Sequence, residues 1–229
     1  MTYNVKPKIV LHTTEGGSYE GARGAYSGTH PHFTVSYQRG FFQAWQHASI
    51  LKSAKALKHP YGGVHTNLAG AIQIEIVGQA VNAPKFPQKY LDGIATLMRW
   101  IESAKGIPKR AATFLAYPAS SGNSRVRFSD RAWVEFSGTC GHQHVPDNSH
   151  GDPGAININY LLGVSGTLWP ATDPAASAAE APGTNGQPGD FGKCTSEGRN
   201  GICQARAACG GTVVSGLWSV THFHRRLNA

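Results

Sequence analysis

The chain is organised around one stretch, Cys140-Gly-His-Gln-His-Val-Pro-Asp-Asn-Ser-His-Gly-Asp-Pro-Gly154, which is rich in histidine and aspartate. Imidazole and carboxylate groups are ligands that zinc accepts, and a catalytic zinc usually has three protein ligands and a water. His142 and Asp152 lie ten positions apart (152 − 142 = 10), and Pro146 between them favours a bend. We therefore expect this loop to fold back and present both side chains to one metal ion.

The third ligand has a candidate near the N-terminus. The segment Lys8-Ile-Val-Leu-His-Thr-Thr-Glu-Gly-Gly17 predicts a buried strand that runs into a glycine-rich turn, because three consecutive aliphatic residues precede His12. The end of a strand holds a side chain rigidly, and a metal site needs its ligands fixed before the ion arrives. His12 is thus the expected third ligand.

Together, "IVLHTTEGG" and "GHQHVPDNSHGDPG" resemble the type 2 N-acetylmuramoyl-L-alanine amidases. This family includes phage lysozyme-amidases and is related to the peptidoglycan-recognition proteins. Its zinc ligands are a histidine of the first strand, a histidine of a late Gly-His motif, and an Asp or Cys shortly after it; His12, His142 and Asp152 match these positions. The resemblance, over about residues 8–163, implies zinc-dependent hydrolysis of the amide bond between N-acetylmuramic acid and L-alanine in peptidoglycan.

A non-catalytic module that only binds peptidoglycan is the alternative function, because recognition proteins of the same family share the fold. Such proteins typically lack the third ligand, whereas Asp152 is present here. The sequence therefore favours the enzyme.

A carboxylate on a predicted central strand also requires explanation. Residues 67–78 predict a buried strand, and strict alternation places Gln73 and Glu75 on one face, opposite the isoleucines at 72, 74 and 76. Because an unpaired buried charge is costly, Glu75 either forms a salt bridge to a lysine or arginine or acts as a base beside the metal. A glutamate of the family's corresponding strand faces the zinc site, and Glu75 matches it.

The other histidines and the cysteine of the central loop receive different interpretations. His150 stands where the family commonly has a cationic residue, which implies that it stabilises the oxyanion or donates a proton to the leaving amine; an exposed loop histidine is the alternative. His144 is not expected to bind the metal, because its place in the family motif varies. We expect Cys140 to pack in the core, and His32 to line the cleft or pack in the core.

The remaining pattern predicts an α/β fold with a central mixed β-sheet flanked by helices. Ser18 and the residues through Tyr26 predict a short capped helix, and a hairpin is expected over 30–46 with Arg39-Gly40 at its bend. Apolar residues at helical spacing predict a long helix over 87–106. An irregular cleft loop is expected over 114–127, and a short helix from Pro153 through Leu162.

Composition limits the class of partner. The formal net charge of +8 over 229 residues indicates an anionic partner, and the acidic bacterial cell wall meets this requirement. Nucleic acid is not expected, because no run of lysine and arginine is interleaved with aromatic residues. No stretch of about 18 apolar residues predicts a membrane span. We expect a monomer.

The composition changes near residue 167. We expect a zinc amidase domain over 1–166, a Pro/Ala/Gly-rich linker over 167–190 and a cysteine-containing tail over 191–229. Cys194, Cys203 and Cys209 predict a small disulfide module in an oxidising compartment. The tail faintly resembles that of secreted fungal amidases, which continues to further cysteines, so the module is expected to be incomplete.

The expected location is extracellular, as the family resemblance and the tail cysteines imply. No apolar segment typical of a signal peptide follows Met1.

Overall fold

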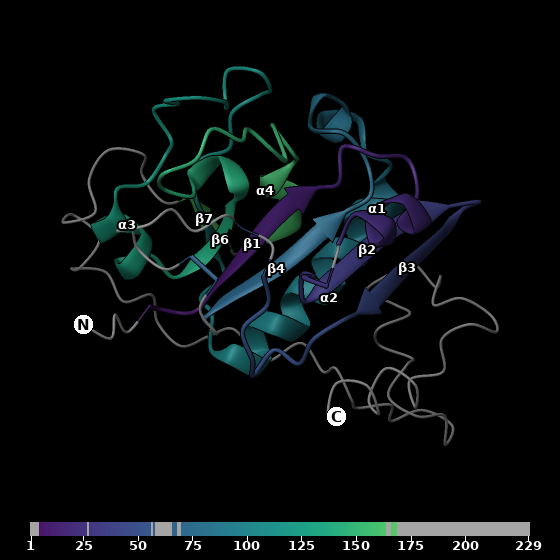
Figure 1. Ribbon diagram of the computed structural model, residues 1–229, viewed down its shortest axis with the longest axis horizontal. Coiled ribbons are helices and arrows are strands. Elements are labelled where there is room, and N and C mark those ends of the chain that lie inside the picture. Colours follow the sequence, from purple (N-terminus) through teal and green to yellow (C-terminus); the bar gives the residue numbers. More distant parts are fainter. Residues whose placement is uncertain are drawn as a thin grey trace.

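The computed structural model describes residues 5–26, 28–55, 57, 66–67, 70–163 and 166–168. Within these residues, seven strands form one sheet whose neighbouring strands are parallel except for β2 and β3 (Figure 1). In sheet order the strands are β3 (Phe41–Gln46), β2 (Phe33–Gln38), β4 (Ala71–Ile76), β1 (Lys8–Thr13), β6 (Gly138–Gly141), β5 (Arg110–Ala111) and β7 (Thr167–Leu168). Helices pack against the sheet, and the predicted α/β class with a mixed sheet is confirmed.

Strand β1 lies between β4 and β6 and is parallel to both. Parallel neighbours end at the same edge of a sheet, so residues at their carboxyl ends come together from distant parts of the chain. His12 pairs in register with Glu75 of β4, and Leu11 pairs with Gly141 of β6, which directly precedes His142. The topology thus gathers the predicted site at one edge.

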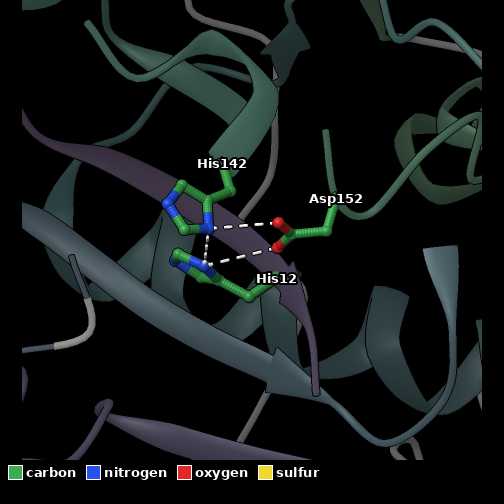
Figure 2. A group of neighbouring side chains, drawn as sticks. All are labelled: His12, His142 and Asp152. Carbon is green, nitrogen blue, oxygen red and sulfur yellow. Dashed lines mark hydrogen bonds and ion pairs between the residues drawn. The ribbon is translucent and has the colours of Figure 1, made fainter. Parts of the chain in front are cut away.

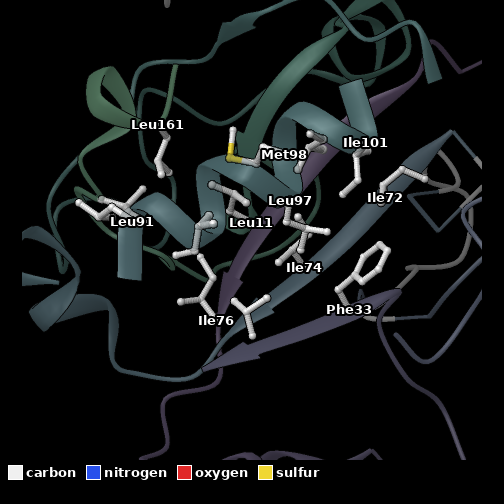
Figure 3. Close-up of a cluster of buried hydrophobic side chains, with 14 of the residues drawn as sticks. Leu11, Phe33, Ile72, Ile74, Ile76, Leu91, Leu97, Met98, Ile101 and Leu161 are labelled. Carbon is white, nitrogen blue, oxygen red and sulfur yellow. The ribbon is translucent and has the colours of Figure 1, made fainter. Parts of the chain in front are cut away.

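One face of the sheet is apolar and is covered by α2 (Gln88–Lys105) and α4 (Ile158–Leu162). The isoleucines at 72, 74 and 76 point from β4 toward Leu97, Met98 and Ile101 of α2 (Figure 3). Helix α2 ends where predicted, since Gly106 adopts the left-handed conformation (φ 63°) that glycine reaches without steric cost.

The opposite face is mostly polar beside β2 and β4, and α1 (Tyr19–Ala25) covers its outer part. The rings of Tyr19 on α1 and Trp45 on β3 stack with centroids 3.7 Å apart. Toward β6 this face becomes apolar, because Trp133 of α3 (Asp130–Glu135) packs there with Val10 and Cys140. Cys140 is therefore a buried core residue, as expected.

Two local predictions are confirmed in detail. The Ser18 hydroxyl accepts a hydrogen bond from the Gly21 amide at 3.1 Å and caps α1. Arg39 and Gly40 both have positive φ, 51° and 81°, as a two-residue hairpin turn between β2 and β3 requires.

The helix predicted from Pro153 begins later, at Ile158. Gly154 has a φ of 65°, which interrupts any helical run from Pro153, and the Asn157 side chain instead caps the helix by accepting from the Tyr160 amide at 3.1 Å. Residues 112–129 contain no helix or strand, as expected for a loop. The sequence did not predict α3, β5, β6, β7, η1 (Ala80–Lys85) or η2 (His142–His144), all of which are short.

Among the described residues, no helix combines the length and the apolar character needed to cross a bilayer. Strand β7 extends the sheet two residues into the segment expected to begin the linker. The rest of the linker and the three tail cysteines lie outside the described residues.

Candidate metal centre

Three side chains from separate parts of the chain meet at the carboxyl edge of the sheet. His12 is on β1, His142 opens η2 directly after β6, and Asp152 follows on the returning loop (Figure 2). All three are buried, and each offers a ligand atom within 4.8 Å of the others. The structure therefore brings together the three residues that the sequence proposed as metal ligands.

The distances between their ligand atoms match those around one tetrahedral ion. Nδ1 of His12 and Nδ1 of His142 are 3.2 Å apart, His142 Nδ1 lies 3.1 Å from Asp152 Oδ1, and His12 Nδ1 lies 3.6 Å from Asp152 Oδ2 (Figure 2). Ligands about 2.1 Å from a tetrahedral zinc lie about 3.4 Å from one another. The side chains are thus already spaced to hold a single ion.

Gln143, a buried glutamine between His142 and His144, fixes the position of Asp152. The Gln143 amide donates to the Asp152 carbonyl, and its side chain donates to the Gly154 carbonyl, both at 2.9 Å. Its side-chain oxygen also accepts from the Leu115 amide at 2.8 Å. Gln143 thereby ties the loop to the segment after β5, and nothing in the sequence pattern beyond its place in the motif predicts this role.

The electrostatics of the centre favour the protonation states that bind metal. Burial lowers the pKa of His12 to about 4, and the nearby His142 adds to this, so the His12 ring is neutral near neutral pH. Burial alone would raise the pKa of Asp152. The electrostatic influence of His142 and His12 and the hydrogen bonds from His142 and the Thr13 amide outweigh burial, and they hold that pKa below its usual value. Neutral imidazole and ionised carboxylate are the ligand forms that a divalent cation needs.

Glu75 lies beside the three candidate ligands. Its Oε1 is 3.9 Å from His12 Nδ1, and its side chain is 15% exposed. Among the described residues, no lysine or arginine lies within ion-pair distance of it, so the salt-bridge interpretation finds no partner there. Burial, with the negative charges of Asp152 and Glu15, raises the pKa of Glu75 to about 8.

His150 covers the outer side of the centre. Its ring stacks on that of His142 with centroids 4.4 Å apart and an interplanar angle of 5°. Nδ1 of His150 lies 3.8 Å from Asp152 Oδ1, and its side chain is 55% exposed. It therefore combines contact with the buried ligands and access to solvent.

The remaining candidates lie away from the centre. His144 is fully buried, and its ring nitrogens contact the Gly141 amide at 2.9 Å and the Thr113 carbonyl at 3.0 Å. His32 is also fully buried, with its ring between the Gln73 amide and the Lys52 carbonyl. Both rings bind backbone groups and serve the packing of the domain.

Comparison with known proteins gives one structural likeness. No family model matches the chain, and no curated protein sequence matches it. The chain is similar to the Staphylococcus aureus hydrolase AmiA, whose crystal structure contains its ligand, with 14% identity and a TM-score of 0.44 over 70% of this chain and 72% of that chain. Values this low establish neither a shared activity nor a shared site.

Proposed function

We propose that the protein is a zinc-dependent amidase that cleaves the bond between N-acetylmuramic acid and L-alanine in peptidoglycan. The observation that carries the proposal is the convergence of His12, His142 and Asp152, with ligand atoms 3.1–3.6 Å apart. Two imidazoles and one carboxylate form a donor set typical of catalytic zinc, which leaves one position for the reactants.

Zinc bound by these residues would supply a Lewis acid that polarises an amide carbonyl and activates water at neutral pH. The protein contributes a rigid frame for this chemistry. His12 is fixed by a central strand, and Asp152 is held by the Thr13 amide at 3.3 Å and by the backbone hydrogen bond from Gln143. Little reorganisation of these side chains is needed when the ion arrives.

Glu75 is the proposed general base. Its carboxyl group stands next to His12 on the neighbouring strand, 3.9 Å from Nδ1 of that ring. The pKa of about 8 keeps the group mostly protonated in the metal-free protein at neutral pH, and a bound divalent cation would favour the ionised form that a base requires. Glu75 would take the proton of the attacking water and pass it on toward the leaving amine.

His150 is the proposed stabiliser of the reacting carbonyl oxygen or proton donor to the leaving nitrogen. Its stacking on His142 keeps the imidazole above the centre, while its exposed edge can reach a substrate that arrives from solvent. A positively charged imidazole at this place would stabilise the negative charge that develops on the carbonyl oxygen during amide hydrolysis.

The substrate class rests on the paired sequence motifs and on the charge of the chain. The motifs around His12 and His142 are those that resemble the muramoyl-alanine amidases, and a net charge of +8 suits an anionic polymer. Peptidoglycan lies outside the cytoplasm of bacteria, so we also propose that the protein acts extracellularly.

Hydrolysis of purified cell walls tests the proposal. The wild-type protein should clear a wall suspension and release new L-alanine amino termini, and a chelator should stop both until zinc is restored. His142→Ala should be inactive, whereas His30→Ala, which removes a partly buried histidine outside the centre, should retain activity. Binding to walls without any new amino termini would favour the recognition module instead.

A further inference from the structure

Gln73 is a buried amide at the centre of the sheet, between two isoleucines on β4. Its side chain is fully buried, on the face opposite the hydrophobic core beneath α2. The sequence indicated only a polar interruption of an otherwise apolar strand. Its contact with His12 suggests a more definite role.

The Gln73 side chain contacts the far nitrogen of the His12 ring. Gln73 Oε1 lies 2.8 Å from His12 Nε2, while His12 Nδ1 is directed at His142 and Asp152. The two ring nitrogens of His12 therefore have separate neighbours, a carbonyl oxygen on one side and the candidate metal centre on the other.

These neighbours favour one tautomer of the neutral ring. A carbonyl oxygen can only accept, so Nε2 must carry the proton to form this hydrogen bond. Nδ1 then has a free lone pair, directed at the position that an ion between His142 and Asp152 would occupy. In the other tautomer, two acceptors would face each other across 2.8 Å, and a proton on Nδ1 would stand where the metal binds.

The cost of this arrangement for folding also indicates a positioning role. The amide nitrogen of Gln73 is buried and has no hydrogen-bond partner among the described residues. A buried donor without a partner is destabilising, and an apolar side chain of similar size would avoid that cost. The Gln73 side chain is thus poorly suited to packing and well suited to accepting a hydrogen bond from His12 Nε2–H.

The backbone of Gln73 is held in place on the side of β2. Its amide donates to His32 Nδ1 at 3.0 Å, and His32 Nε2 donates in turn to the Lys52 carbonyl at 2.9 Å. The strand backbone that carries the acceptor is therefore fixed relative to β1 by the sheet and relative to β2 by a buried ring.

We propose that Gln73 is a positioning residue that holds His12 in the Nε2–H tautomer and so presents Nδ1 to the metal. Ligand histidines generally need such an acceptor on their second nitrogen, and loss of one typically weakens metal affinity about 10–100-fold. The effect on metal affinity rests on the proposed function, whereas the tautomer is a property of the metal-free protein.

Nitrogen-15 NMR of the histidine rings in metal-free protein tests the tautomer directly. The wild-type His12 ring should show a protonated Nε2 and an unprotonated Nδ1, and Gln73→Met should mix the tautomers or shift the proton to Nδ1. Gln73→Glu preserves the acceptor and should preserve the wild-type tautomer. A proton on Nδ1 in the wild type, or an unchanged Nε2–H signal in folded Gln73→Met, would overturn the proposal.

Zinc affinity, measured by competition with a chromophoric chelator, gives the second readout. Gln73→Met should weaken binding about 10–100-fold, and Gln73→Glu should retain it. Ser36→Ala is the matched control, because Ser36 is also fully buried with a partnerless hydroxyl among the described residues but lies on β2. It should leave zinc affinity unchanged, and an equal loss in both variants would assign Gln73 a merely structural role.

The two proposals fail in different ways. If the wild type binds no zinc, the proposed function is wrong, and the NMR signals of metal-free His12 still decide the role of Gln73. If the wild type binds zinc but Gln73→Met binds it equally well, the amidase proposal stands and the positioning role is wrong.

Discussion

The two faces of the central sheet differ in composition and in what their side chains contact, and the six residues of β4 show both faces. Ile72, Ile74 and Ile76 face α2 and are fully buried among apolar side chains (Figure 3). Gln73 and Glu75 alternate with them and face the other way, toward His12. One face contributes to stability through buried apolar area, and the other places polar groups where folding alone would not favour them.

This difference predicts that variants of the two faces will affect different properties of the protein. Changes on the apolar face should lower the free energy of unfolding and leave metal binding intact. Changes around His12 should alter metal binding or turnover while the fold persists, because the polar side chains there contribute little to the packing against α2.

The largest effect is expected for Asp152→Asn. The amide keeps the size of the side chain and can still accept from the Thr13 amide, but it loses the charge that binds the ion. Zinc content should fall well below one ion per chain, and wall hydrolysis should fall to background. Asp147→Asn is the control, because Asp147 is an exposed residue of the same loop. Full zinc content in Asp152→Asn would remove Asp152 from the ligand set.

Glu75→Gln should reduce turnover about 10²–10⁴-fold, the usual contribution of a general base. Zinc content should stay near one ion per chain, since Glu75 is not among the three ligands. Metal analysis together with the rate of wall hydrolysis measures both. A zinc-loaded variant with nearly normal activity would rule out the catalytic role and move the base to His150.

Glu75→Gln should also change the pH dependence of stability in the metal-free protein. A carboxyl whose pKa is raised to about 8 stays protonated in the folded chain while the unfolded chain releases its proton near 4.5. Its contribution to stability is therefore complete below that lower pKa and is lost as pH rises through about 8. Unfolding measured across this range should show a smaller decline in the variant, and identical declines would contradict the shifted pKa.

Ile74→Ala tests the apolar face at the residue between Gln73 and Glu75. Loss of a fully buried isoleucine should cost about 2–5 kcal/mol, because the cavity cannot close under a packed helix. Urea unfolding measures the change. Zinc affinity of the folded variant should remain that of the wild type, and a large loss of affinity would mean that the two faces are coupled.

The apolar face was predictable from sequence because its pattern repeats. The alternating isoleucines of β4 and the helical spacing of Leu91, Ile94, Leu97 and Met98 each predict their own element without knowledge of partners. Short elements such as β5 and β7 have only two residues each, too few for any period to appear. The start of the last helix depended on the backbone of Gly154, which composition does not determine.

The polar face was predictable only in part. Strand alternation placed Gln73 and Glu75 together, and the paired motifs selected His12, His142 and Asp152, which the structure gathers. Individual contacts across the sheet depend on register, and the register of β1 with β4 joins residues more than sixty positions apart. The hydrogen bond that Gln73 Oε1 accepts from His12 and the complete burial of Lys8 therefore appear only in the folded chain.

Lys8 provides the last and smallest test, because it is a charge buried at the far end of the strand that carries His12. Its Nζ donates to the Lys6 carbonyl at 2.6 Å and lies 4.9 Å from the centre of the Trp133 ring. Burial lowers its pKa from 10.5 to about 8. Lys8→Met should remove the cost of burying the charge and lose these two contacts, for a net gain on the order of 1 kcal/mol at about pH 7.

The sign of the pH dependence identifies the cause of this gain. Between about pH 8 and 10.5 the folded wild type has released the Lys8 proton while the unfolded chain still holds it, so wild-type stability should rise over this range. Lys8→Met lacks this rise, and the difference between the two proteins should shift steadily toward the wild type as pH increases. Urea unfolding at both ends of the range measures the difference. A difference in stability that does not change with pH would contradict the lowered pKa of Lys8. This end of the face would then differ from the end at His12 and would behave as an ordinary apolar core.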